Sequence, residues 1–132
     1  MKYQFRYRGN LIVIPVNIYG DASILPRKIL LALDTGSTKT IIQPLNIGLI
    51  GYSEKEKIKD VGITTGSKTE KGYEIRIEQL HCLGFIWDKP TIIVKQLPLS
   101  LYYIDGLLGL DFFQSINKKL TIDFEKTEIQ ID

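Results

Sequence analysis

Cysteine and histidine are almost absent from this chain of 132 residues, which contains one of each, Cys82 and His81. A single cysteine excludes a disulfide within the chain and is typical of proteins in a reducing compartment. One histidine and one cysteine are too few to hold a structural zinc ion from this chain alone. We therefore expect no metal site, and nothing in the sequence indicates a cofactor.

These two scarce residues are neighbours, which raises the alternative of a thiol nucleophile beside a histidine base. Adjacent residues of a strand point to opposite faces, so the side chains of His81 and Cys82 would diverge. We expect both to fill the core or the surface rather than to form a catalytic pair.

An excess of one charge is also lacking, because 17 basic and 15 acidic residues give a formal net charge of +2. This excess is too small to indicate binding to nucleic acid or to an anionic membrane. No apolar run approaches the length of about 20 residues that spans a bilayer. Pro15 and Asn17 interrupt the run that begins at Leu11, so it does not form the apolar segment of a signal peptide. We expect a cytoplasmic protein with no nucleic-acid or membrane partner.

The chain does contain a regular pattern of short strands. Its length and its apolar content of 44% fit a single domain over residues 1–132, with residues 1–9 as an N-terminal arm or short strand. Apolar residues alternate or run in short blocks, which indicates strands at 11–19, 28–33, 40–42, 61–77, 83–87, 91–97, 119–124 and 129–131. A helix is expected over 111–116, and 45–60 stays undecided beyond the alternative of one polar helical turn at 54–57. This pattern predicts an all-β, barrel-like domain.

The most informative segment is the apolar run at residues 30–33, which ends on Asp34. A run without polar interruptions is typical of a strand buried on both faces. An ionised and unpaired carboxylate at the end of such a strand is costly, so a fold that keeps one there usually uses it. Thr35, Gly36 and Ser37 then provide a turn. The alternative is that Asp34 only accepts hydrogen bonds from the amides of this turn.

Two further informative segments follow downstream. Residues 61–77 alternate as the strands of a hairpin do, and the polar tip at 64–72 contains two glycines. Such a tip either projects from the body and moves, or is only a solvated loop. Residues 107–109, Leu-Leu-Gly, would let a strand pass close beside another backbone just before a helix begins.

The order of these segments resembles the retropepsin-like aspartic peptidases, in particular their cellular and bacterial branch. Members of this family have an Asp-Thr/Ser-Gly-Ser/Ala loop, a flap hairpin, an apolar-apolar-Gly segment and a C-terminal pair of strands. The resemblance covers residues 10–132 and implies a single-lobe, closed β-barrel with a flap hairpin and one short C-terminal helix. The sequence departs from the family pattern in two places. The last turn, 125–128, lacks a glycine, and residues 45–60 do not clearly match the helix-containing insert of the family.

The resemblance also implies roles for single residues. The match to the Asp-Thr-Gly loop makes Asp34 the catalytic aspartate, Thr35 the hydroxyl residue that links two active-site loops, and Gly36 the glycine beside the substrate. The match to the flap implies substrate contacts from Ile63, Thr64, Thr65, Gly66 and Ser67. Structural support for the catalytic loop is expected from Ser37, Leu107, Leu108 and Gly109.

The chemistry of such an enzyme needs two carboxylates that share one proton and one water. Like charges at that distance do not both ionise easily, so the two carboxylates titrate as a pair. The chain contains one Asp-Thr-Gly, and Asp105, Asp111 and Asp123 lack the Thr/Ser-Gly that would follow a second one. The second aspartate is therefore expected from another copy, through a two-fold axis between two Asp34 side chains. A different chain with its own Asp-Thr-Gly is the alternative partner.

Two functions fit the sequence. The first is an aspartic-type endopeptidase, a hydrolase that acts on an extended peptide or protein held by main-chain pairing with the flap and by apolar pockets. The alternative is a catalytically silent module that binds peptides or dimerises through the same fold. Binding of nucleic acid by a small β-barrel is disfavoured by the near-neutral charge.

Overall fold

The structure is a computed structural model that describes residues 1–65, 67–101 and 103–132. Most of the chain forms strands, as the alternating apolar pattern predicts. The strands are β1 (Lys2–Gln4), β2 (Arg6–Arg8), β3 (Leu11–Tyr19), β4 (Arg27–Leu33), β5 (Ile41–Ile42), β6 (Lys59–Thr65), β7 (Lys68–Arg76), β8 (Gln79–Cys82), β9 (Phe85–Asp88), β10 (Thr91–Val94), β11 (Gly106–Leu108), β12 (Leu120–Asp123) and β13 (Glu128–Ile131). The helical segments are α1 (Pro44–Leu49), η1 (Glu54–Glu56), η2 (Leu99–Leu101) and α2 (Leu110–Ile116).

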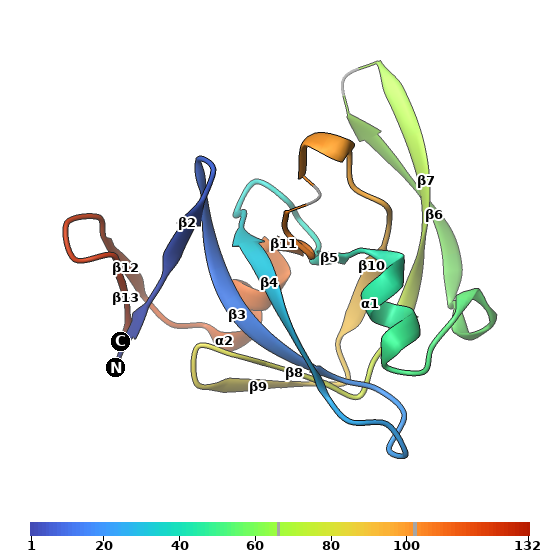
Figure 1. The fold of residues 1–132 in the computed structure, drawn as a ribbon, viewed down its shortest axis with the longest axis horizontal. Helices are drawn as coiled ribbons and strands as arrows, with labels where there is room; N and C mark the ends of the chain where they lie inside the picture. Colours follow the sequence, from blue (N-terminus) through green and yellow to red (C-terminus); the bar gives the residue numbers. More distant parts are fainter. Residues whose placement is uncertain (66, 102) are drawn as a thin grey trace.

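A 10-stranded sheet curls around the interior of the molecule and forms its main layer (Figure 1). The strands follow the order β6-β7-β10-β5-β11-β4-β3-β8-β9, and β2 pairs with β3. Within the described residues this order has two ends, β6 and β9, so the sheet is a half-barrel rather than a fully closed barrel. The all-β class and the short helix near the C-terminus are confirmed, and α1 is an additional helix.

A second sheet of 3 strands, β1-β13-β12, joins the two ends of the chain (Figure 1). The register pairs Tyr3 with Ile129, and the amino group of Met1 donates to the carbonyl oxygen of Ile131 at 3.2 Å. Residues 1–9 thus form two short strands that belong to different sheets, because β2 pairs with β3 while β1 pairs with β13.

The central strand β4 is buried on both faces, as predicted from its uninterrupted apolar run. Leu31 is 0% exposed and lies in the larger core cluster, whereas its neighbour Ala32 is 1% exposed and lies in a smaller cluster on the other face. β4 pairs with β3 on one side and, in parallel, with β11 on the other. The end of β4 is therefore fixed by neighbours on both edges and both faces, which gives the residue after it a defined position.

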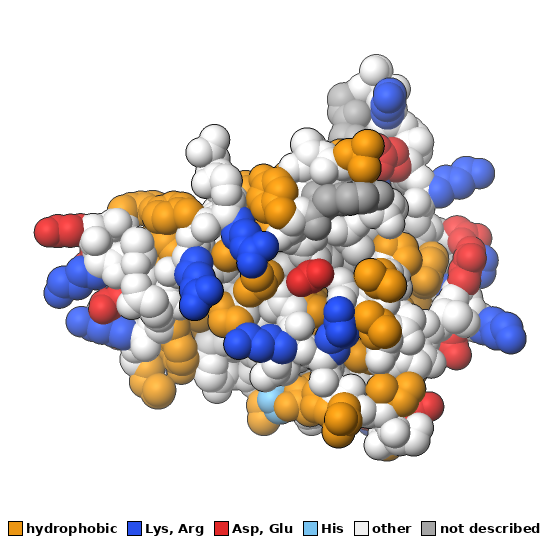
Figure 2. Space-filling view, in the orientation of Figure 1, with side chains coloured by type: hydrophobic (Ala, Val, Ile, Leu, Met, Phe, Trp, Pro, Cys, Tyr) orange, Lys and Arg blue, Asp and Glu red, His pale blue; other side chains and the backbone are white. Residues whose placement is uncertain are grey.

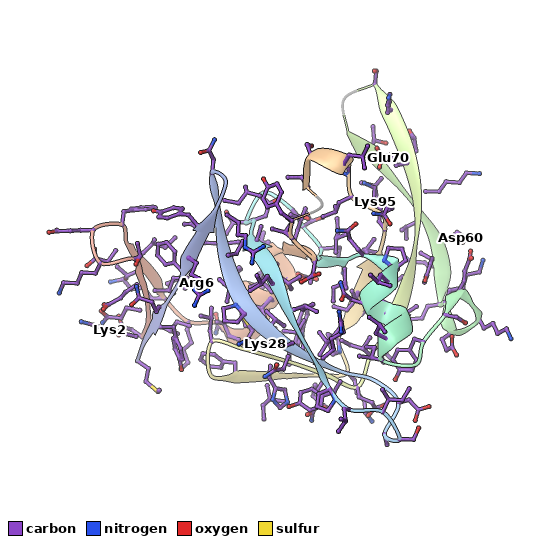
Figure 3. All side chains as sticks on the ribbon, in the orientation of Figure 1. Lys2, Arg6, Lys28, Asp60, Glu70 and Lys95 are labelled. Carbon is purple, nitrogen blue, oxygen red and sulfur yellow. The ribbon has the colours of Figure 1, made fainter. Side chains whose placement is uncertain are left out.

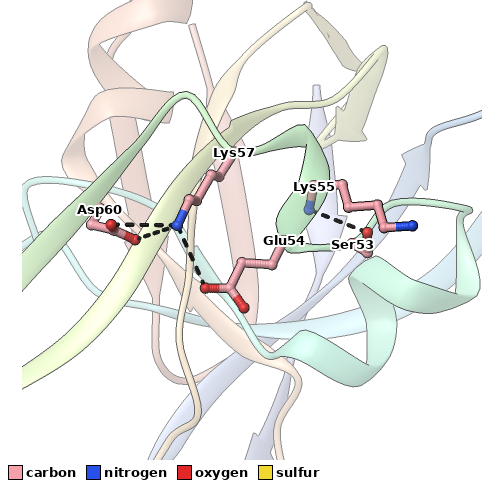
Figure 4. A network of polar contacts seen from close by, with 5 residues as sticks. All are labelled: Ser53, Glu54, Lys55, Lys57 and Asp60. Atoms are coloured by element: carbon pink, nitrogen blue, oxygen red, sulfur yellow. Dashed lines mark hydrogen bonds and ion pairs between the residues drawn. The ribbon is translucent and has the colours of Figure 1, made fainter.

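The undecided segment 45–60 contains α1 and the polar turn η1. Pro44 lies in the first turn of α1, where its missing N–H costs nothing, and Ile47 is fully buried in the core. In η1 the side chain of Ser53 caps the turn, and Lys57 forms ion pairs with Glu54 at 3.7 Å and with Asp60 at 3.1 Å (Figure 4). The alternative of one polar helical turn at 54–57 is confirmed.

Charged side chains of both signs cover the surface. In the view of Figure 2, basic side chains gather over β2, β3 and β4, whereas acidic and basic side chains alternate around the hairpin β6–β7 and η1. The exposed basic residues of β2 and β4 are Arg6, Arg8, Arg27 and Lys28. The hairpin β6–β7 itself projects beyond the body of the molecule (Figure 1).

Candidate active site

Asp34 lies directly after β4, beside the end of the parallel strand β11. Its backbone N–H donates to the carbonyl oxygen of Leu108 at 3.0 Å, which continues the β4–β11 ladder by one bond. The Asp34 side chain is half-buried. The carboxylate is therefore carried by a rigid strand end and still reaches the surface, as a catalytic group must.

The residues after Asp34 form a tight turn around its carboxylate. The N–H of Gly36 donates to Asp34 Oδ1 at 3.1 Å, and the N–H of Ser37 donates to the Asp34 carbonyl oxygen at 3.1 Å. A Cβ on Gly36 would lie 3.2 Å from Asp34 Oδ1, tighter than ordinary contact, so glycine keeps the space beside the carboxylate open. Thr35 is exposed, and the Ser37 hydroxyl donates to the Lys39 carbonyl oxygen at 2.7 Å within the turn.

The segment 107–109 lies beneath this turn. Leu107 and Leu108 pair with Ala32 and Leu33 of β4, and the N–H of Leu110 donates to the Ser37 carbonyl oxygen at 2.7 Å. At Gly109 an added Cβ would lie 2.5 Å from the carbonyl carbon of Lys39, closer than van der Waals contact allows. The backbone of residues 37–40 therefore rests directly on that of residues 108–110.

Two residues that the sequence analysis did not select, Thr40 and Asp111, tie the same segments together. The Thr40 hydroxyl donates to Asp111 Oδ1 at 2.7 Å, and it accepts the N–H of Gly109 at 3.1 Å. The Thr40 N–H donates to Asp111 Oδ2 at 3.0 Å. Thr40 is 0% exposed, so the Thr40 end of each bond is buried, and the bond from Gly109 is buried at both ends. The sequence offered one signal, an acidic residue in the first turn of α2, but nothing in it indicated the partner.

The other aspartates considered for a second catalytic group have structural partners. Asp105 accepts the N–H of Leu30 at 2.8 Å and the side-chain amide of Asn46 at 3.0 Å. Asp111 holds Thr40, as described above, and Asp123 accepts two backbone N–H groups of the turn that follows it, each at 3.0 Å. Each of the three carboxylates thus stabilises the fold locally.

A cleft of about 610 Å³ opens above Asp34 and runs under the hairpin β6–β7. Its lining is mostly apolar, with Asp34, Glu70 and Lys95 as the charged members among the described residues. The lining residues are Asp34, Gly36, Ser37, Thr38, Ile41, Ile63, Thr64, Glu70, Lys95, Leu97, Pro98, Leu101 and Leu107. The structure thus brings Asp34 together with the hairpin and with the segment that precedes β11.

The residues expected in the flap are distributed along this hairpin. Ile63 and Thr64 line the cleft, Thr65 ends β6, and Ser67 is an exposed turn residue before β7. Gly66 lies outside the described residues. On the cleft wall, the ammonium group of Lys95 is hydrogen-bonded to Glu70 and holds the pKa of that carboxyl below its usual range.

His81 and Cys82 do not form a catalytic pair. The ring of His81 stacks on Tyr19 with centroids 4.3 Å apart, and its Nε2 lies 2.9 Å from the side-chain oxygen of Gln79. Cys82 is buried in the core, and this burial raises the pKa of its thiol far above the usual range. A thiol that stays protonated is a poor nucleophile, so the alternative of thiol catalysis is set aside.

The statistical model of the aspartyl protease family matches residues 14–112, well over half of the chain. The chain belongs to this family. Among solved structures, a retropepsin-like aspartic protease from Rickettsia conorii has a similar fold, with a TM-score of 0.70 at 17% identity. The similarity covers 98% of this chain and 97% of that one, so the single-lobe, retropepsin-like fold is confirmed. A comparison with curated proteins gave no match.

The matched part of this aspartyl protease contains all three segments that carried the sequence-based expectation. Residues 14–112 include the turn after β4, the hairpin β6–β7 and the segment 107–109, and end inside α2. The strands β12 and β13 lie beyond the family match, and most of that region is covered by the structural similarity. Within the described part of the chain, no helix is long and apolar enough to cross a membrane.

Proposed function

We propose that this aspartyl protease is an active endopeptidase, which hydrolyses peptide bonds with a water held between the Asp34 carboxylates of two copies. The observation that supports the proposal most is the position of Asp34. Its half-buried carboxylate stands at a rigid strand end, at the floor of a mostly apolar cleft, and accepts the N–H of Gly36 at 3.1 Å. Such a group is oriented before substrate arrives, which is what general acid–base catalysis requires.

The proposed reaction uses two Asp34 carboxylates that share one proton. The ionised carboxylate takes a proton from the water, whose oxygen attacks the carbonyl carbon of the peptide bond. The protonated carboxyl donates its proton to the carbonyl oxygen, so a neutral tetrahedral diol forms. The diol collapses as the carbon–nitrogen bond breaks. One hydroxyl gives its proton to the ionised carboxylate, and the protonated carboxyl gives its proton to the leaving nitrogen, so the pair again holds one proton.

The second carboxylate comes from a second copy of the chain. Asp105, Asp111 and Asp123 hold parts of the fold, and the described cleft contains one aspartate, Asp34. A two-fold axis that passes beside Asp34 would bring two of these carboxylates together and complete the site. Thr35 is exposed next to Asp34, so its hydroxyl is available for a contact across that axis.

The substrate is proposed to be an extended peptide with apolar side chains around the cleaved bond. The cleft walls are formed by aliphatic residues, including Ile41, Ile63, Leu97 and Leu107. Burial of apolar side chains against such walls favours binding, and main-chain pairing with the hairpin would hold the peptide extended. Ile63 and Thr64, which line the cleft, would lie over the bound peptide.

Cleavage of a diverse peptide library from acidic to neutral pH tests this function. We expect the wild type to cleave and Asp34→Asn to be inactive at concentrations where both are dimeric. Asp123→Asn, the same substitution at the end of β12 and outside the cleft, should retain activity. Equal cleavage by wild type and Asp34→Asn would point to a contaminant and contradict the assignment.

No cleavage by any variant, with dimers confirmed, would favour the silent peptide-binding module. Binding of a statine-type transition-state mimic separates the two functions, because such a mimic binds tightly only where the two carboxylates are assembled.

A further inference from the structure

An ion pair on the cleft wall joins the hairpin β6–β7 to the body of the molecule. Lys95 follows β10 directly, and its ammonium group contacts Oε2 of Glu70, which lies on β7. The side chain of Lys95 is 7% exposed, that of Glu70 37%. Figure 3 shows the two side chains facing each other between the hairpin and the segment around η2. Both residues line the same cleft as Asp34.

The pair lies just beyond the point where the hairpin leaves the main sheet. The ladder between β7 and β10 ends with Tyr73 opposite Val94, and from Gly72 to Lys68 the register of β7 is with β6. At Gly72 the two backbones still touch, since an added Cβ would lie 2.7 Å from the Val94 carbonyl oxygen. Glu70 is therefore on the projecting part of the hairpin, whereas Lys95 is on the body.

Because Lys95 is buried, its ammonium group depends on the contact with Glu70. An ammonium group that is taken out of water needs a partner, and removal of that partner is much more costly than loss of an exposed ion pair. Lys95 thus favours hairpin positions in which Glu70 stays within reach. The pair between Lys59 and Glu74 differs, because it is 3.8 Å long and joins β6 to β7 within the hairpin.

We infer that Lys95 and Glu70 are positioning residues, whose ion pair sets the height of the hairpin β6–β7 above Asp34. This inference rests on the proposed peptidase function for its catalytic consequence. The hairpin is fixed to the sheet at its root, and Ile63 packs against the smaller core cluster. The ion pair is a further contact on the cleft side, nearer the tip of the hairpin, and limits how far Ile63 and Thr64 stand from a bound peptide. Without the pair, the hairpin rises and the peptide is held less well.

Amide hydrogen exchange of the free protein tests the structural part without any need for activity. In Glu70→Gln and in Lys95→Met, we expect amide exchange at Ile63, Thr64 and Lys71 to accelerate about tenfold. This factor lies between those expected for the loss of an exposed ion pair and of a buried one. Exchange in β12 and β13 should stay unchanged. Lys95→Met leaves no buried unpaired charge, because the carboxylate that remains, Glu70, is 37% exposed, so this variant stays informative if Glu70→Gln folds poorly.

Two controls make the result specific to this ion pair. Glu74→Gln is the same substitution on the same strand and breaks the pair within the hairpin, so it should leave the exchange rates near the wild-type values. The double variant Glu70→Lys, Lys95→Glu restores opposite charges and should return exchange toward the wild-type rates. Equal acceleration in Glu74→Gln, or none in either single variant, would overturn the inference.

Steady-state kinetics tests the catalytic consequence. A hairpin that contacts substrate and transition state alike affects binding of both, so Lys95→Met should raise KM about tenfold and change kcat less than about threefold. An unchanged KM in a cleaving enzyme overturns the positioning role and leaves the peptidase function intact. If the wild type does not cleave, the peptidase function fails, while hydrogen exchange still decides whether the pair holds the hairpin.

Discussion

At Gly109 the addition of one methyl group is enough to disturb the candidate site. A Cβ there would meet the Lys39 carbonyl carbon at 2.5 Å and its oxygen at 2.6 Å, and both are backbone atoms that cannot rotate away. We expect Gly109→Ala to lower the free energy of unfolding by about 3 kcal/mol, as overpacked cores do. Urea denaturation followed by circular dichroism measures this change.

Gly48→Ala is the matched control for that measurement. Gly48 lies in α1, is exposed, and has no heavy atom within 4 Å of an added Cβ. Alanine is the better helix former, so this variant should gain up to about 1 kcal/mol. If both variants change stability by the same small amount, the close approach at Gly109 is not as tight as described.

The thiol of the single cysteine should be unreactive in the folded protein. Cys82 is 3% exposed, and burial raises the pKa of its thiol, so the reactive thiolate is scarce at neutral pH. We expect iodoacetamide at pH 8 to leave Cys82 unmodified in the native state and to modify it fully in denaturant. Mass spectrometry detects the difference, and rapid labelling of the native protein would contradict the burial of this side chain.

At the scale of elements, the contact between the turn after Asp34 and α2 depends on Thr40. In Thr40→Val the buried N–H of Gly109 loses its partner. The Asp111 carboxylate loses the hydroxyl but keeps the N–H groups of Phe112 and of residue 40. Buried polar groups without a partner are costly, so we expect a loss of about 3 kcal/mol in the free energy of unfolding. Denaturant unfolding of purified variants gives the value.

Thr121→Val provides the comparison for Thr40→Val. Thr121 is an exposed residue of β12, where valine suits a strand as well as threonine does. This variant should stay within about 0.5 kcal/mol of the wild type. A similar loss in both variants would mean that the hydroxyl of Thr40 has no special role.

The sequence predicted those elements whose signal is local. The alternation at residues 61–77 predicted the hairpin, but the expected tip at 64–72 was too long, because β6 continues to Thr65 and β7 begins at Lys68. The apolar run at 30–33 predicted a strand buried on both faces with Asp34 at its end. The helix α1 was not predicted, because Gly48 and Gly51 weaken a helical pattern and its six residues are few. It forms because Ile47 fills the core and Asn46 holds Asp105.

The contacts that hold the candidate site were beyond prediction, because they join distant positions. Thr40 and Asp111 are 71 positions apart in the sequence, and no local pattern of apolar and polar residues indicates that they meet. The same holds for Glu70 and Lys95, each of which is an ordinary charged residue in its own segment. The turn at residues 34–37 was predictable because its glycine and its hydroxyl residues stand next to the aspartate.

At the scale of the whole molecule, a site shared between two chains predicts a specific loss of activity when wild-type and inactive chains are mixed. If each copy supplies one Asp34, a dimer that contains a single Asp34→Asn chain is inactive. An equal mixture of wild type and Asp34→Asn, after exchange of subunits, should therefore show about one quarter of the activity of wild type at the same total protein concentration. Peptide cleavage after incubation of the mixture measures this fraction.

Independent chains would give a different fraction. Dilution of the wild type with an equal amount of an unrelated protein should leave about one half of the activity, because no mixed dimers form. One half in the mixture with Asp34→Asn as well would show that each chain acts alone, and would contradict the shared site.

The pairing of β1 with β13 affects the order in which parts of the chain fold. The bond from Met1 to Ile131 spans 130 positions, so the sheet β1-β13-β12 closes a loop that contains almost the entire chain. Contacts of such separation form slowly, and we expect this sheet to assemble after the half-barrel. Until β1 arrives, one edge of β13 is open to strands of other molecules. Pairing with β1 thus protects the edge of β13 from intermolecular contacts, and aggregation competes with this final step of folding.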